Sequence, residues 1–163
     1  MRILGIDPGT GICGFGVIEV TKNRTKAIDF GIIATPPHTP LSERLEDIYD
    51  SLFEIIKQNQ PDIASIEKLF FTKNITTGIS VAEARGVCLL ALKKHNIPYY
   101  EYTPNEIKKA MTGYGSANKK QMQEMVRLHL NLEKAPQPDD AADALAAAIT
   151  HSFLCKSASK LSS

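Results

Sequence analysis

The 163-residue sequence has no long hydrophobic run, few cysteines and almost no net charge. No apolar stretch approaches the roughly 18 residues that a membrane-spanning helix needs, so we expect no membrane span. The amino terminus lacks the basic segment followed by an apolar one that marks a secretion signal. The three cysteines lie far apart and form no CxxC pair, which argues against a disulfide framework and a zinc site. We therefore expect a cytoplasmic protein.

The rest of the composition is that of an ordinary globular protein, with 43% apolar and 23% charged residues. A chain of this length buries a substantial core, and we expect one domain over residues 1–155 with a flexible tail over 156–163. The net charge of +1 is unevenly distributed, because six Lys or Arg and three Glu lie between Pro104 and Lys134. On charge alone this cluster favours a solvated helix face over phosphate contacts.

Hydrophobic periodicity predicts three strands followed by alternating helices and strands. The first three strands are expected at 2–7, 13–20 and 26–35, and a short link at 21–24 suits a hairpin meander. The later strands are expected at 62–67 and 98–102, and the later helices at 41–56, 76–95, 118–131 and 140–153. Strands that follow helices should lie parallel to the first strand. The pattern predicts an α/β fold, with a five-stranded mixed sheet and helices on both faces.

Local signals mark several helix ends. Thr39-Pro40 suits an N-cap followed by the first helical position. Thr103-Pro104-Asn105-Glu106 is a capping box with proline at the first helical position, and the short helix that follows is expected to end at Gly113. Residues 113–116 read as a flexible glycine-rich loop.

Four acidic residues occupy positions where carboxylates need a partner. Asp7 ends the first strand and Glu67 ends the fourth, so in a parallel pair they would lie about 4.8 Å apart at one sheet edge. Asp140 and Asp143 share one face of a helix start, and that start packed at the same edge would join them. Buried carboxylates without His or Cys neighbours fit a hard cation such as Mg²⁺ or Mn²⁺.

Two such ions about 3.5–4 Å apart activate a water and stabilise a leaving oxygen, which is the chemistry of phosphodiester hydrolysis. Each acid also has a simpler interpretation. Asp7 suits a turn cap, and Glu67 suits an exposed strand end. Asp140 and Asp143 suit ordinary first-turn helix acids. From the residues alone, the metal cluster and these separate roles both stay open.

Several short motifs follow one another in order from residue 1 to about 151. They are Gly5-Ile6-Asp7-Pro8-Gly9, Ile66-Glu67 with Phe70, Ala84-Arg85-Gly86, Gly115-Ser116-Ala117-Asn118-Lys119, and Asp140-Ala141-Ala142-Asp143 with the alanine-rich helix to His151. Together they resemble the RuvC Holliday-junction resolvases. The resemblance implies a ribonuclease H-like fold and a homodimer that cuts four-way DNA junctions at two symmetric phosphodiesters, leaving 5′-phosphate and 3′-hydroxyl ends. It also implies work beside a branch-migration motor in DNA recombination and repair.

The resemblance assigns roles to individual residues. The catalytic metal ligands, for two Mg²⁺ or Mn²⁺ ions, would be Asp7, Glu67, Asp140 and Asp143. Phe70 matches an aromatic that stacks on an unpaired base, a contact worth about 1–3 kcal/mol, although Phe70 and Phe71 also fit core positions. Lys108 and Lys119 match basic residues near the scissile phosphate. Lys120, beside Lys119 at the same helix start, is a further candidate for phosphate contact.

One of these assignments has a close competitor. Asp139 immediately precedes Asp140, and it also lies one helical turn before Asp143. The spacing of the Asp-Ala-Ala-Asp motif favours Asp140 as the ligand and Asp139 as the N-cap of the helix.

Two other classes of protein share part of the pattern. Asp-Pro-Gly-Thr-Gly after a strand resembles the first phosphate loop of the actin-like and sugar-kinase ATPases. Those proteins need a second glycine-rich phosphate hairpin and a second comparable domain, and 163 residues are too few for both. A non-catalytic binder of branched DNA is the third interpretation. The intact acidic set argues against it, because four carboxylates repel phosphates when no metal is present.

Overall fold

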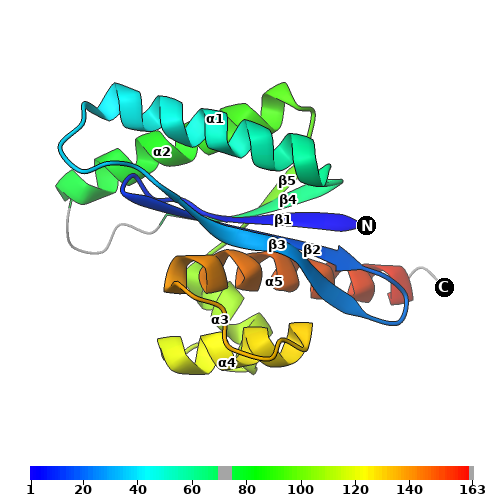
Figure 1. The fold of residues 1–163 in the computed structure, drawn as a ribbon. Coiled ribbons are helices and arrows are strands. Elements are labelled where there is room, and N and C mark those ends of the chain that lie inside the picture. Colours follow the sequence, from blue (N-terminus) through cyan, green and yellow to red (C-terminus); the bar gives the residue numbers. More distant parts are fainter. Residues whose placement is uncertain (70–74, 162–163) are drawn as a thin grey trace.

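The computed structural model describes residues 1–69 and 75–161 (Figure 1). The described residues form one five-stranded sheet whose strands are β1 (Arg2–Asp7), β2 (Ile12–Val20), β3 (Thr25–Ala34), β4 (Ile63–Glu67) and β5 (Tyr99–Tyr102). Their order across the sheet is β3-β2-β1-β4-β5. The first three strands pair antiparallel, whereas β4 is parallel to both β1 and β5. This confirms the predicted mixed sheet.

Helices cover both faces of the sheet. They are α1 (Leu41–Asn59), α2 (Ile75–Lys94), α3 (Pro104–Thr112), α4 (Lys119–Leu130) and α5 (Asp139–Leu161). Figure 1 shows α1 and α2 on one face, and α3, α4 and α5 on the other. Each face therefore has its own hydrophobic core, with Ile6 and Leu52 in the first and Ile3 and Leu145 in the second. Over the described part of the chain, no helix combines the length and apolar content needed to span a membrane.

Side-chain caps fix the ends of α3 and α4. Thr103 accepts a hydrogen bond from the Glu106 backbone N–H, and the Glu106 carboxylate accepts one from the Thr103 N–H in return. Asn118 and Gln121 form the same reciprocal pair at the start of α4. Gly113 ends α3 with a φ of 82°, a left-handed conformation that suits glycine. The predicted capping box is confirmed, and caps of this kind contribute about 0.5–2 kcal/mol each.

Predictions for the ends of two helices are wrong. The hydroxyl of Thr39 donates to the Pro36 carbonyl oxygen (2.9 Å) in the preceding turn, so α1 begins at Leu41 without a side-chain cap. The last helix begins one residue before its predicted start and continues to Leu161, well past the predicted end at Phe153. It therefore includes residues 156–161, which the sequence assigned to a tail. The division into one domain and a tail stays a prediction.

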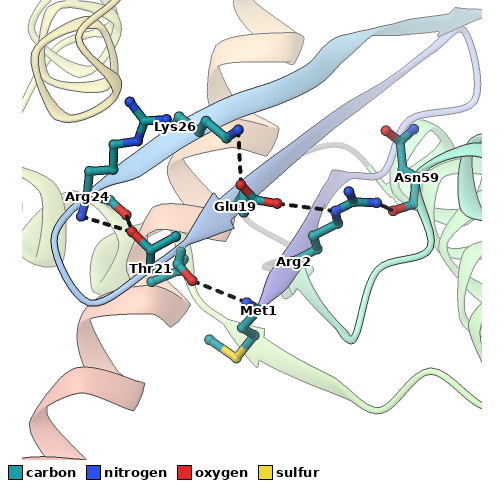
Figure 2. Close-up of polar contacts among 8 residues, drawn as sticks. Met1, Arg2, Glu19, Thr21, Arg24, Lys26 and Asn59 are labelled. Carbon is teal, nitrogen blue, oxygen red and sulfur yellow. Dashed lines mark hydrogen bonds and ion pairs between the residues drawn. The ribbon is translucent and has the colours of Figure 1, made fainter.

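Charged residues join the start of β1 to its neighbours, as Figure 2 shows. Glu19 of β2 lies 3.0 Å from the Lys26 ammonium and 3.6 Å from the Arg2 guanidinium. Arg2 also donates to the carbonyl oxygen of Asn59 (2.7 Å), at the end of α1. Partly exposed pairs of this kind contribute at most about 1 kcal/mol each. They hold the end of β1 that lies opposite Asp7.

The fifth helix lies unusually close to the central strands. A Cβ atom added at Gly5 of β1 would overlap the carbonyl oxygen of Ala144, and one at Gly14 of β2 would overlap that of Asp140. On β4, the Ser65 hydroxyl donates to the carbonyl oxygen of Ala147 (2.7 Å). Because the strands present glycine or serine here, the backbone of α5 rests directly on the sheet.

We expect Gly5→Ala to destabilise the protein, because the added methyl group meets rigid backbone rather than a movable side chain. Overpacking of this kind costs about 1–3 kcal/mol, which lowers the melting temperature by about 2–12 °C. Gly11→Ala is the control, since a Cβ there meets only the movable Arg44 guanidinium at 3.3 Å. Thermal unfolding measures both variants, and equal melting temperatures would contradict the close packing of α5.

Candidate active site at the head of α5

The sheet points two acidic side chains toward α5. Parallel pairing places Ile6 of β1 beside Ile66 of β4, so Asp7 and Glu67 follow at the same edge. Ile6 and Ile66 both face the core under α1 and α2. Successive side chains of a strand point to opposite faces, so Asp7 and Glu67 face the side that α5 covers (Figure 1).

The first turn of α5 brings the other two acids to the same place. Gly14 is the β2 residue that pairs with Asp7, and the Asp140 carbonyl lies directly over it. Asp143 follows three residues later and therefore shares a face of the helix with Asp140. The amino end of a helix carries a partial positive charge that favours carboxylates. The structure thus gathers the four predicted acids, Asp7, Glu67, Asp140 and Asp143, at one end of the sheet.

The acids perturb one another strongly. Burial and the nearby carboxylates of Glu67, Asp143 and Asp140 raise the pKa of Asp7 from 3.8 to about 8. Burial and Asp143 raise the pKa of Glu67 to about 7, against the opposing effect of Lys108. Burial also raises the pKa of Asp143. Such shifts mean that the group carries more negative charge than its surroundings neutralise, which is the setting for a bound cation.

The chemistry of this donor set fits a hard divalent cation, because all four groups are carboxylates and the nearby lysines cannot act as ligands. Within residues 1–69 and 75–161, however, no three Asp, Glu, His or Cys side chains stand close enough together to hold one ion as they are placed. For three of these acids to hold one ion, their carboxylates would have to turn toward a common point. The predicted ligand set remains a prediction.

A cavity of about 360 Å³ opens beside the acids. Its lining includes the acids Glu67 and Asp143 together with Lys108 and Lys119. Both lysines act on the acids, since Lys108 and Lys119 each lower the pKa of Asp143 against the effect of burial. Positive charge therefore lies beside the acidic cluster in this cavity.

The other two predicted DNA contacts, Lys120 and Phe70, are not placed beside the acids by the described structure. Lys120 lines a separate cavity of about 380 Å³ with Tyr114 and Met125, so the structure does not bring it to the acids. Phe70 lies outside the described residues.

Asp139 has a role that the sequence did not reveal. One carboxylate oxygen accepts from the Gln123 amide (2.5 Å), and the other lies 3.3 Å from the Lys119 ammonium. Asp139 is thus the first residue of α5, and its side chain binds α4 instead of serving as the predicted N-cap. The spacing of Lys119 and Gln123, four apart on one helix face, was the only sequence signal for this contact.

Known proteins resemble this chain over nearly its whole length. Residues 3–151 match the family model described as crossover junction endodeoxyribonuclease RuvC. The chain belongs to the RuvC family. A RuvC of this description from Thermotoga petrophila is 53% identical over 153 residues, which cover 94% of this chain and 93% of the relative.

Solved structures show the same fold. The structure of Thermus thermophilus RuvC superposes with a TM-score of 0.89 at 33% identity, covering 97% of each chain. A second structure is of the same T. thermophilus protein in complex with a Holliday junction substrate, and it gives a TM-score of 0.87 at 31% identity over 96% of each chain. The ribonuclease H-like fold predicted from the resemblance is confirmed.

We expect Asp7→Asn to stabilise the metal-free protein at pH 8. The pKa of Asp7 is higher in the folded chain than its ordinary value, so the folded state holds an extra proton between about pH 4 and pH 8. Stability therefore falls as the pH rises through that window, and the neutral amide removes the loss. A gain of about 1–3 kcal/mol, or about 2–12 °C in melting temperature, is expected in EDTA.

The control is Asp47→Asn, which neutralises an exposed carboxylate on α1 and should leave the melting temperature unchanged. Thermal unfolding between pH 5 and pH 8 in EDTA measures both variants. A lower melting temperature for Asp7→Asn at pH 8 would contradict the repulsion within the acidic cluster.

Proposed function

We propose that this protein resolves four-way DNA junctions by metal-dependent hydrolysis of two symmetrically placed phosphodiesters, in recombination and repair. The products are nicked duplexes with 5′-phosphate and 3′-hydroxyl ends. The observation that carries the proposal is the convergence of four acids beside a cavity lined with lysines. Membership of the RuvC family, and the T. thermophilus relative solved with a Holliday junction substrate, support the choice of DNA substrate.

The four acids are the ligands in this proposal, for two Mg²⁺ or Mn²⁺ ions. Bound together, such ions supply an activated water and a counter-charge for the leaving oxygen. Asp7 and Glu67 are fixed by the sheet, while Asp140 and Asp143 are fixed by a helix that rests on the sheet backbone. Ligands held on regular elements keep their geometry better than ligands on loops.

The lysines have a separate task. A cluster of carboxylates repels the DNA backbone, so positive charge is needed where the scissile phosphate approaches. Lys108 and Lys119 line the same cavity as Glu67 and Asp143, which suits them to bind that phosphate. Phe70 is proposed to stack on an unpaired base at the junction, and Lys120 to contact phosphate farther from the acids.

Symmetric cleavage requires two active sites related by a two-fold axis, so we propose that the protein acts as a homodimer. The outer face of α1 and α2 suits the contact. It holds a groove of about 590 Å³ whose lining includes Leu45, Tyr49, Val87 and Leu90. Ile79 and Leu90 of α2 are 55% and 50% exposed, which is high for large apolar side chains. We also propose that the protein acts together with a branch-migration motor and is located in the cytoplasm.

The first experiment is cleavage of a labelled four-way junction and a linear duplex of the same sequence, each with Mg²⁺ or EDTA. Paired cuts in the junction alone, and only with Mg²⁺, are expected. We also expect Asp140→Asn to reduce the rate at least about 100-fold, because it removes a ligand worth several kcal/mol in the transition state. Asp139→Asn is the matched control and should keep cleaving, since Asp139 binds α4.

Each contrary outcome would indicate a different function or a different metal ligand. Junction binding without cutting in either condition would indicate a structural binder of branched DNA. Equal cutting of junction and duplex would indicate a general nuclease with the same fold. Loss of activity in Asp139→Asn but not in Asp140→Asn would move the ligand by one residue.

We expect Leu90→Glu to convert the dimer to a monomer, because a carboxylate has no partner in an apolar interface. Sedimentation in an analytical ultracentrifuge measures the mass, and circular dichroism checks that the variant is folded. Leu128→Glu is the control, since Leu128 is 55% exposed on α4, on the other side of the sheet. A wild-type monomer, or a Leu90→Glu dimer as stable as wild type, would contradict this interface.

A further inference from the structure

A second cluster of reactive side chains lies on α5, well beyond the acids. His151 is buried, with 3% of its surface exposed, and both ring nitrogens have a side-chain partner. Its Nδ1 atom lies 2.7 Å from the hydroxyl of Tyr102, at the end of β5. Its Nε2 atom lies 3.2 Å from the Sγ atom of Cys155, one helical turn farther along α5. Neither the four acids nor the two cavity lysines belong to this cluster.

The arrangement has the three parts of an activated nucleophile. A thiol lies within hydrogen-bond reach of an imidazole, and a third group on the far ring nitrogen orients that imidazole. The ring of Tyr100 packs on the imidazole as well, with centroids 4.6 Å apart and an angle of 32° between the planes. Tyr102 and Tyr100 therefore fix the ring so that Nε2 faces the sulfur of Cys155.

Burial sets the resting protonation of the pair. It lowers the pKa of His151, so the imidazole is neutral and free to accept a proton near pH 7. It raises the pKa of the Cys155 thiol, so the proton stays on sulfur until the sulfur reacts. Among the side chains that the structure describes, the titratable groups beside the cluster are Tyr100 and Tyr102 of β5, and Glu106 of α3 acts on Tyr102 from farther away.

Accessibility separates Cys155 from the other two cysteines. Cys13 and Cys88 are fully buried in the core beneath α1 and α2. Cys155 is only partly buried, so its thiol is the one that we expect a small reagent to reach from solvent. Over the described residues, it is the one thiol that combines an open side with a neighbouring base.

We propose that Cys155 is a site of covalent modification by low-molecular-weight disulfides, with His151 as general base and Tyr102 as the residue that positions it. The Cys155 sulfur attacks one sulfur of the disulfide, and its proton passes to His151 Nε2. A new Cys155–sulfur bond forms while the disulfide bond of the reagent breaks. The departing thiolate takes the proton from His151, which yields one free thiol and one mixed disulfide.

The test is the reaction of the whole protein with dithiodipyridine, which releases a coloured product with each thiol that reacts. We expect one equivalent to react in the folded protein, and mass spectrometry to place it on Cys155. Cys13 and Cys88 serve as internal controls and should react only after denaturation. Cys155→Ser should abolish the reaction of the folded protein with dithiodipyridine. Reaction at Cys13 or Cys88 first, or no reaction in the folded protein, would overturn the proposal.

The dependence of the rate on pH distinguishes a working base from a merely structural contact. A lone thiol below its pKa reacts about tenfold more slowly for each unit that the pH falls, because only the thiolate attacks. When the proton passes to His151, the net charge of the pair is unchanged. The reaction rate should therefore change little with pH in the range between the pKa of His151 and the pKa of Cys155.

His151→Gln should restore the tenfold slope and slow the reaction about 10–100-fold near pH 7. Tyr102→Phe, which keeps the ring but removes the orienting hydroxyl, should give a smaller loss of rate. Circular dichroism checks the fold of each variant, and the wild-type profile alone decides the matter if His151→Gln does not fold. A tenfold slope in the wild type, or equal rates for wild type and His151→Gln, would overturn the proposal.

Discussion

The contact between α5 and the glycines of the central strands is the constraint on which both the fold and the acidic site depend. At Gly5 and Gly14 the helix backbone occupies the space that a Cβ atom would need. Because interiors are densely packed, a larger residue at either position must displace the helix from the sheet. Such a displacement would also move Asp140 and Asp143 away from Asp7. The stability of the core and the spacing of the acids are therefore fixed by the same contact.

Repulsion between the acidic side chains opposes the close packing of α5 on the sheet. The close approach of α5 brings acidic side chains together in a partly buried place, and the pKa of Asp7 rises to about 8 as a result. Lys108 and Lys119 offset part of the repulsion at Asp143, where each of them lowers the pKa. Burial outweighs the two lysines, so the pKa of Asp143 is still raised. Uncompensated carboxylates of this kind destabilise the metal-free protein, and the proposed binding of a cation would relieve their repulsion.

The sequence predicted those features that local rules determine. Asp7 and Glu67 were placed correctly because each ends an apolar strand and parallel strands end at one sheet edge. The capping box at Thr103 was predicted because its signal spans only four residues. The failures depend on contacts between distant segments. The start of α5 was missed by one residue because the Pro138 carbonyl oxygen accepts from the N–H groups of Ala141 and Ala142. No local pattern revealed that the Asp139 side chain binds Lys119 and Gln123 of α4.

Neighbouring lysines show the same limit. Lys119 and Lys120 are adjacent at the start of α4, so no composition or spacing distinguishes them as phosphate contacts. Successive residues of a helix point about 100° apart, and only the packing of α4 decides which one faces the acids. Lys119 lines the cavity with Glu67, and Lys120 lines another. The hydrogen bond between His151 and Tyr102 was equally hidden, because it joins residues 49 apart in the chain.

The acidic cluster and the pair formed by His151 and Cys155 both include residues of α5. The neutral pair adds no charge to the acids, but strand β5 connects the two sites. Asp143 and His151 are eight residues apart, about 12 Å along a helix, and the pair formed by His151 and Cys155 is neutral at rest. The thiol cluster therefore leaves the charge at the acids unchanged. Tyr102, however, pairs with Glu67 in the register of β5 and β4, and its side chain bonds to His151. The hydrogen bond that orients His151 thus also holds the strand residue beside Glu67, so the geometry of one site bears on the geometry of the other.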